Sequence, residues 1–331
     1  MNGLSRRRMI AISAAAAGIA LLPGCSGRRV EASTWRGQAL GAEASLRIYH
    51  HDRHIAAMLV DRVVTEVQRL EGIFSLYRPD SDLVRLNRAG YLTFPPPELL
   101  TLIHRSQAFA RLTGGAFDPS VQPLWRAYQQ AFAAGAPPSA DILRHARALV
   151  GIDRVHASTA RIALPAEGAG LTFNGIAQGY ITDRVVALLR AAGVTRSLVN
   201  MGEIRAIGTA ADGRPWRVGL ASPTDPAQVS RMLELDSAAV ATSSPSGFHF
   251  DAGGRFGHII DPHSGATSAR HASVTVVAAD ATSADALATA FTLMDETDIH
   301  ATLARLPGTT VHLLDVSGRW RMIPATAPAT A

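Results

Sequence analysis

The sequence has no lysine, a single cysteine and no long apolar run after its first residues. All 32 strongly basic side chains among the 331 residues are arginines. A Walker-type phosphate loop, which needs a lysine, is therefore excluded, as are internal disulfides and cysteine clusters that hold zinc or iron. Stability must come from the burial of apolar surface, for which the roughly 300 residues after the leader suffice.

The N-terminal residues have the pattern of an export signal. Arg6-Arg7-Arg8 and their neighbours are typical of twin-arginine export, and the following apolar run, 11–22, is too short to span a bilayer comfortably. The run leads to Cys25 in the context LPGC, which resembles a bacterial lipobox with an unusual proline. An ordinary signal peptide with a chance cysteine is the alternative. We expect a signal peptide at 1–25, export to the periplasmic side and a membrane anchor at Cys25.

The rest of the chain carries little net charge. Removing the three leader arginines takes the formal charge from +5 to +2. No segment combines clustered arginines with aromatic residues, so we expect no nucleic-acid partner. We expect a short tether at 26–34, one catalytic domain at 35–324 and a tail at 325–331.

Short turn-bounded strands mixed with amphipathic helices predict an α+β fold. Helices are expected at 53–74, 96–112, 120–132, 139–150, 282–293 and 298–306. Strands are expected at 44–49, 155–157, 161–164, 197–200, 216–220, 232–235, 239–242, 256–262, 273–278 and 310–316.

The stretch 171–190, LTFNGIAQGYITDRVVALLR, predicts a strand, a glycine-bearing turn and a helix. Asn174-Gly175 suits positive φ and close backbone approach, and Gly179 adds a second glycine. From Tyr180 onward the apolar residues recur at helical spacing. The N–H groups at the start of such a helix suit a phosphate, although plain chain reversal is the alternative.

Three side chains outside this stretch could take part in chemistry. Asp285 and Thr289 lie four residues apart on a predicted helix, so their oxygens share one face and could bind Mg²⁺. A solvated aspartate and a threonine bonded to its own helix backbone is the alternative. His258 lies between apolar residues and is either structural or a general base beside a phosphate.

Five blocks of the sequence together resemble the ApbE family of exported flavin transferases, the FAD:protein FMN transferases. They are FSLYRPDSDLVRLN, TGGAFDPSVQPLW, NGIAQGYITDRV, HIIDPHSG and SVTVVAADATSADALATA, in the family's order and at similar spacing. The resemblance covers about residues 35–314. It implies an ApbE-like α+β fold in which helices flank a mixed, largely antiparallel sheet.

The resemblance also implies a site that distant segments build. The block around His258 holds the family's candidate catalytic histidine. The family's metal ligands match Gly175, Asp285, Ala288 and Thr289, of which the glycine and the alanine could offer only carbonyl oxygens. The flavin contacts match Leu40, Tyr77, Ala116, Phe117, Asp118, Thr172, Gln178 and Ile259. The chain departs from the family where an acid is frequent (Thr172), where a charged residue is frequent (Gln178) and at a glycine pair (200–203).

The implied reaction is Mg²⁺-dependent phosphoryl transfer from FAD. A threonine or serine hydroxyl of a membrane or exported redox protein attacks the FMN-side phosphorus, and AMP leaves. Hydrolysis of FAD to FMN and AMP would use the same metal site with water as the nucleophile. A flavin-binding lipoprotein without catalysis is a second alternative, and a solute-binding lipoprotein without affinity for FAD is a third.

Overall fold

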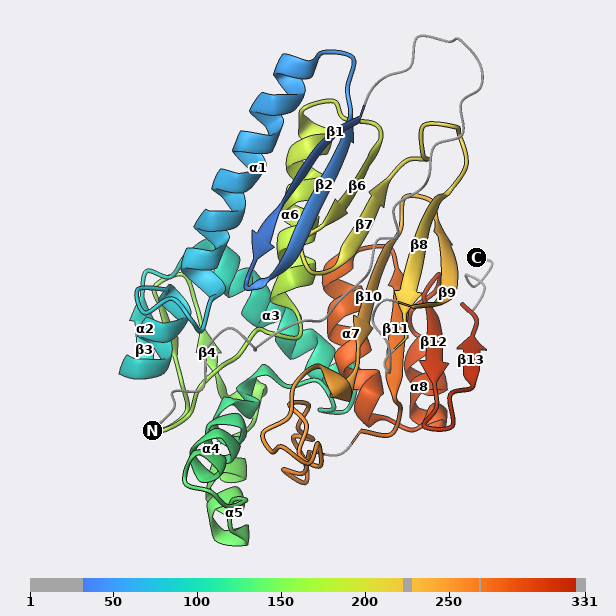
Figure 1. The fold of residues 1–331 in the computed structure, drawn as a ribbon. Helices are drawn as coiled ribbons and strands as arrows, with labels where there is room; N and C mark the ends of the chain where they lie inside the picture. The colour runs from blue at the N-terminus through green and yellow to red at the C-terminus, as the bar shows by residue number, and fades with distance from the viewer. Residues whose placement is uncertain (1–31, 223–227, 268, 326–331) are drawn as a thin grey trace.

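The computed structural model describes residues 32–222, 228–267 and 269–325, whose arrangement Figure 1 shows. The strands are β1 (Ala32–Ala39), β2 (Ala42–Tyr49), β3 (Tyr91–Thr93), β4 (His156–Ala157), β5 (Arg161–Ala163), β6 (Ser197–Asn200), β7 (Ile204–Ile207), β8 (Trp216–Ala221), β9 (Val229–Leu235), β10 (Ala239–Ser243), β11 (Ser273–Ala278), β12 (Thr310–Leu314) and β13 (Trp320–Ile323). The α-helices are α1 (Arg53–Phe74), α2 (Asp82–Ala89), α3 (Pro97–Leu112), α4 (Gln122–Ala133), α5 (Ala140–Ala148), α6 (Ala177–Ala191), α7 (Ala281–Leu293) and α8 (Glu296–Leu303). Single 3-10 turns are η2 (Pro119–Val121), η3 (Ile152–Arg154) and η4 (Pro245–Gly247).

One eight-stranded sheet organises the chain. Its strand order is β1-β2-β6-β7-β10-β11-β12-β13, and every neighbouring pair is antiparallel. Strands β3, β5 and β4 form a small separate sheet, and β8 and β9 form a hairpin of their own. The predicted α+β fold with a largely antiparallel sheet is confirmed.

Helices cover one face of this sheet and the β8–β9 hairpin covers the other (Figure 1). On β11, Val274 and Val276 are fully buried in the core that includes α6 and α7, because alternate residues of a strand face the same side. On the other face, Trp216 and Val218 of β8 pack with Val240 of β10. Burial of a side chain of this size stabilises the fold by about 1.5–3 kcal/mol.

Helix α1 runs from the end of β2 back to the turn between β1 and β2. It begins after Asp52, whose side chain accepts hydrogen bonds from the amides of His54 and Ile55. Its buried stripe packs against α6, β1 and β2, and at its far end Glu71 Oε1 accepts a hydrogen bond of 2.6 Å from the backbone of Leu40. The turn after β1 and the loop after α1 therefore lie together.

Strand β1 begins at Ala32, so residues 32–34 belong to the sheet and not to the expected tether. The register pairs Ala32 with Tyr49 and continues to the turn at Leu40. Alternate residues of this edge strand are exposed, and they are polar or small, which is why the sequence lacks a hydrophobic pattern there. Residues 26–31 and the predicted leader at 1–25 lie outside the described residues.

The prediction of a strand at 256–262 is wrong. This segment folds back on its own preceding residues, where Phe250 donates to the carbonyl of Phe256 at 2.8 Å and only an isolated bridge joins His249 to Gly257. An apolar run predicts burial, but it does not predict which neighbour supplies the hydrogen bonds. The run therefore forms a loop over one end of the sheet.

The stretch 171–190 also differs from its prediction. Residues 171–173 are extended but belong to no sheet, because the side chain of Asn87 bonds both the N–H (2.7 Å) and the carbonyl (2.8 Å) of Leu171. Helix α6 begins at Ala177, before Gly179. In the part of the chain described, no helix is long and apolar enough to cross a membrane.

Candidate active site

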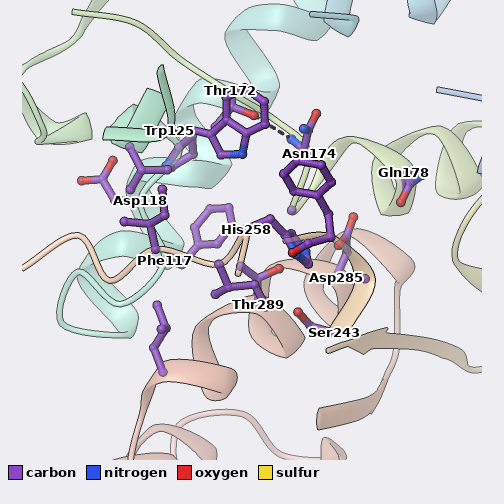
Figure 2. A pocket seen from close by; sticks show the side chains of 18 of the residues that line it. Phe117, Asp118, Trp125, Thr172, Asn174, Gln178, Ser243, His258, Asp285 and Thr289 are labelled. Atoms are coloured by element: carbon purple, nitrogen blue, oxygen red, sulfur yellow. Dashed lines mark hydrogen bonds between the residues drawn. The ribbon is translucent and has the colours of Figure 1, made fainter. Parts of the chain in front are cut away.

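A pocket lies where the start of α6, one face of α7, the segment after α1 and the loop 244–262 meet (Figure 2). It brings together all but one of the residues predicted for the site: Leu40, Tyr77, Ala116, Phe117, Asp118, Thr172, Gly175, Gln178, His258, Ile259, Asp285 and Thr289. The remaining residue, Ala288, does not line it. Segments from nearly the whole chain therefore converge on one place.

The start of α7 is fixed by carboxylates from two elements. Its own cap, Asp280, accepts a hydrogen bond of 2.9 Å from the amide of Ser283. Asp183 of α6 accepts from the amides of Ala281 and Thr282, both at 2.9 Å. These bonds satisfy amides that a helix leaves unpaired at its beginning, and they set the position of the whole helix.

Asp285 lies one turn further along α7, with an exposed fraction of 5%. Its Oδ2 accepts a hydrogen bond of 3.0 Å from the amide of Gly179, which is its one hydrogen bond within the described ranges. Burial raises the pKa of this carboxyl to about 7, the Gly179 amide opposes the rise, and the charge of Asp183 adds to it. A buried acid of this kind favours a cation close by.

Gly179 does not form the turn that the sequence predicted. It lies in the first turn of α6, and a Cβ there would come within 2.2 Å of the carbonyl oxygen of Ala281 and 2.9 Å of the Cβ of Asp285. The glycine therefore permits the close approach of α6 to α7. Its amide, which the sequence suggested for a phosphate, is bonded to Asp285 instead.

Gly175 and Thr289 form a second close contact in the pocket. Gly175 is not among the residues with positive φ, but a Cβ on it would lie 2.8 Å from Thr289 Oγ1. Among the residues described, the Thr289 hydroxyl has no hydrogen-bond partner, whereas Thr292 Oγ1 donates to the carbonyl of Ala288 at 2.9 Å. Ala288 is buried, with an exposed fraction of 1%, and its role as a metal ligand stays a prediction.

These oxygens fit a hard divalent cation. A carboxylate, an unpaired hydroxyl and the backbone of Gly175 are the donor types that Mg²⁺ prefers, with water or substrate oxygens in the other positions. Among the described residues, no cluster of three or more His, Cys, Asp or Glu side chains could hold a metal ion. A softer metal such as zinc has no matching set here.

His258 holds its ring in a defined orientation. Its backbone amide donates to the carbonyl of Phe248 at 3.1 Å, and its Nδ1 lies 3.2 Å from the same oxygen. Because a carbonyl only accepts, Nδ1 carries the proton and Nε2 has the free lone pair of a neutral imidazole. Burial lowers the pKa of His258, although the Phe248 carbonyl opposes this, so the ring is neutral near pH 7.

A ring contact and hydrogen bonds hold the loop that carries the predicted flavin contacts Phe117 and Asp118. Gly114 and Gly115 adopt φ of +59° and +89°, and Phe117 packs edge-on against Phe109 at 6.2 Å between ring centroids. Asp118 accepts from Ser120 at Oδ1 and from the amide of Ile152 at Oδ2. Figure 2 shows its carboxylate directed away from His258, so Asp118 shapes the pocket wall.

The other predicted contacts lie at the pocket rim and floor. Tyr77 is half exposed, and its hydroxyl is hydrogen-bonded to the side chain of Asn174. Thr172 Oγ1 accepts a bond of 3.3 Å from the Asn174 amide, which fixes the approach to Gly175. Gln178 is buried against Gly202, where φ is +104° and a Cβ would lie 2.6 Å from the Gln178 side chain.

Glu203 and Trp125 are among the lining residues that the sequence analysis did not predict for the site. Glu203 has an exposed fraction of 5%, and burial together with the charge of Asp285 raises its pKa well above the normal value. Trp125 of α4 is half-buried and stacks on Phe248, with 6.3 Å between ring centroids. Both belong to short motifs that the sequence analysis used, yet only the folded chain shows that their side chains reach the pocket.

Comparison with known proteins is consistent with this geometry. Residues 40–313 match the model of the ApbE family. The chain is 30% identical to the FAD:protein FMN transferase of Treponema pallidum over 86% of this chain and 85% of that protein. It is also 30% identical to the Vibrio cholerae protein of the same name, over 85% and 87% of the two chains.

Solved structures show the same architecture. The apo form of the flavinyl transferase ApbE from Pseudomonas stutzeri has a TM-score of 0.74 at 27% identity, over 88% of this chain and 94% of that one. The ApbE protein of Thermotoga maritima has a TM-score of 0.76 at 27% identity, over 88% and 96%. Since the family model and both full-length relatives span most of the sequence, this chain belongs to the ApbE family.

Proposed function

We propose that this protein transfers FMN from FAD to a threonine or serine hydroxyl of a partner protein and releases AMP. The observation that carries the proposal is one pocket in which His258 presents a free Nε2 near the buried carboxylate of Asp285 and the unpaired hydroxyl of Thr289. Relatives at 30% identity over most of the chain are FAD:protein FMN transferases.

His258 serves as the general base. The partner's hydroxyl attacks the FMN-side phosphorus and gives its proton to Nε2 of His258. The bond between that phosphorus and the bridging oxygen breaks, and the oxygen leaves with AMP. A well-placed base of this kind contributes roughly 10²- to 10⁴-fold to the rate.

Asp285, Thr289 and the Gly175 backbone would hold the cation. A Mg²⁺ ion at this place would supply positive charge against the pyrophosphate oxygens. Asp183 and Asp280 fix the start of α7, so the carboxylate and hydroxyl keep their place on one helix face. The carbonyl of Ala288, which the resemblance adds to this set, also accepts a hydrogen bond from Thr292 Oγ1.

The cellular setting forms part of the proposal. The leader at 1–25 supports export, and Cys25 supports an anchor on the periplasmic side of a membrane. A membrane or exported redox protein is then the acceptor that such an enzyme could reach.

The test is to incubate the purified protein with FAD, Mg²⁺ and candidate acceptors and to measure AMP and protein-bound flavin together. Equal amounts of the two products support FMN transfer. AMP without bound flavin, with every acceptor, would identify an FAD hydrolase instead. FAD binding without AMP would leave a flavin-binding protein, and no FAD binding would leave a carrier of another solute.

A further inference from the structure

Glu203 is a buried acid of the pocket that the proposed mechanism does not use. It follows Gly202 at the turn between β6 and β7, where its carbonyl accepts from the amide of Met201 and from Thr182 Oγ1, both at 3.1 Å. The second bond ties Glu203 to α6 one turn after Gln178. The backbone of Glu203 is therefore fixed beside the start of this helix.

Asp285 approaches the same turn of α6 from the opposite element, α7, through the amide of Gly179. Both acids line the same pocket, and each has an exposed fraction of 5%. Burial and the charge of Asp285 both raise the pKa of Glu203. Two separate elements thus bring acids to one end of α6.

No basic side chain compensates these acids inside the pocket. Its lining includes no arginine, and His258 is neutral near pH 7. The nearby Arg205 is paired with Asp183 at 2.5 Å. Within the described residues, the backbone of Thr242 is the one hydrogen-bond partner of the Glu203 carboxylate. Buried carboxylates without a basic partner are stable only when they are protonated or bind a cation.

We propose that Glu203 is a second carboxylate of the divalent-cation site and binds the cation together with Asp285 and Thr289. This inference rests on the proposed function, because it adds a residue to the same site. Carboxylates from two elements would bind the cation before FAD arrives. The cation would in turn offset the repulsion between the two acids.

The experiment measures Mg²⁺ binding to the full-length protein without FAD, by calorimetry at pH 8. Glu203→Gln keeps the shape and removes the charge, and we expect it to weaken Mg²⁺ binding at least about tenfold. Glu234→Gln, on the exposed side of β9, is the matched control and should bind Mg²⁺ as the wild type does. Thermal unfolding provides a second measurement, because Mg²⁺ should raise the melting temperature of the wild type and of the control but not of Glu203→Gln.

Wild-type Mg²⁺ affinity in Glu203→Gln would overturn the inference, and so would a wild type that binds no Mg²⁺ without FAD. If Glu203→Gln does not fold, Glu203→Asp keeps the charge on a shorter side chain and should bind Mg²⁺ more weakly than the wild type; wild-type Mg²⁺ affinity in Glu203→Asp, with a wild-type fold, would count against the inference. FMN transfer is assayed separately. A wild type that binds Mg²⁺ but releases no AMP would contradict the proposed function and leave the cation site standing.

Discussion

The backbone amide of Gly179 donates a hydrogen bond of 3.0 Å to Oδ2 of Asp285. This contact joins the first turn of α6 to α7 at the residue proposed to hold the cation. It also explains the glycine, because any Cβ at this position would overlap the backbone of Ala281. The helix packing and the chemistry of the site therefore depend on the same contact.

We expect Gly179→Ala to destabilise the protein by about 1–3 kcal/mol or more, as over-packing of a helix contact does. The displaced α7 should also lower FMN transfer. Urea unfolding gives the change in free energy. Gly72→Ala in α1 is the control, since no atom lies within 4 Å of its Cβ position. Alanine there should stabilise the fold by about 0.5–1 kcal/mol and leave transfer unchanged. Equal urea midpoints for wild type and Gly179→Ala would show that α6 and α7 can move apart at little cost in free energy.

Asp285→Asn should weaken Mg²⁺ binding by about tenfold or more and slow transfer, because it removes a charge without changing the shape. Since burial raises the pKa of Asp285 to about 7, protons should compete with Mg²⁺ in the wild type. Its Mg²⁺ affinity should therefore fall as the pH drops below about 7, and the variant should show a weaker dependence on pH in this range. The measurement is a Mg²⁺ titration of FAD-dependent AMP release at several pH values. Asp153→Asn, on the exposed surface, is the control; a wild-type titration for Asp285→Asn would refute the metal assignment.

His258→Ala should bind FAD normally and transfer FMN roughly 10²- to 10⁴-fold more slowly. Only the neutral imidazole can accept a proton, and burial lowers the pKa of His258 below its usual value. With saturating Mg²⁺, the wild-type rate should therefore be on its plateau at pH 7 and fall as the pH drops through this lowered pKa. The rate of His258→Ala should not show this fall at acidic pH. His145→Ala, on the exposed side of α5, should behave as wild type. An unchanged rate in His258→Ala would leave the histidine a structural role.

Cys25→Ser should release the protein from membranes, because Cys25 is the only cysteine that could carry a lipid. The measurement is the distribution of the protein between membrane and soluble fractions of the expressing cells. The activity of the released protein toward FAD should be unchanged, since the described fold begins at Ala32. Equal membrane association of both proteins would refute the anchor.

The site could be predicted from the sequence where spacing alone places a side chain. Asp285 and Thr289 share one face of any helix that contains them, and the structure keeps them together in the pocket. The resemblance added Tyr77 and Phe117 and grouped them with His258, which no periodicity could do. Ala288 was assigned by the resemblance alone, and its carbonyl, which accepts from Thr292 within the helix, stays a predicted ligand.

The errors came from contacts between segments far apart in the chain. Residues 171–173 look like a strand, but Asn87 supplies the hydrogen bonds that a neighbouring strand would give. Gly179 looks like a turn residue, yet its role depends on the backbone of Ala281, about a hundred positions later. Glu203 looks like an ordinary turn acid until the fold buries it beside Asp285. Local propensity contains no information about these distant partners.

Trp125 provides a last prediction, because its ring is held in one orientation at the pocket wall. It stacks on Phe248 and meets Phe250 at 5.4 Å between centroids, and both phenylalanines belong to the loop that leads to His258. The neighbouring Phe117 and Ile259 are apolar, so we expect this wall to contact the flavin ring and not the adenine.

Trp125→Ala should weaken FAD binding by roughly 3- to 10-fold, the value of one aromatic contact, and Trp125→Phe should retain most of the affinity. Calorimetry with FMN and with AMP identifies which ring of FAD contacts Trp125, because Trp125→Ala should lose affinity for FMN and not for AMP. If Trp125→Ala loses affinity for AMP instead, the adenine lies against Trp125. Equal FAD affinities of the wild type and both variants would show that Trp125 supports the loop of His258 without contacting the substrate.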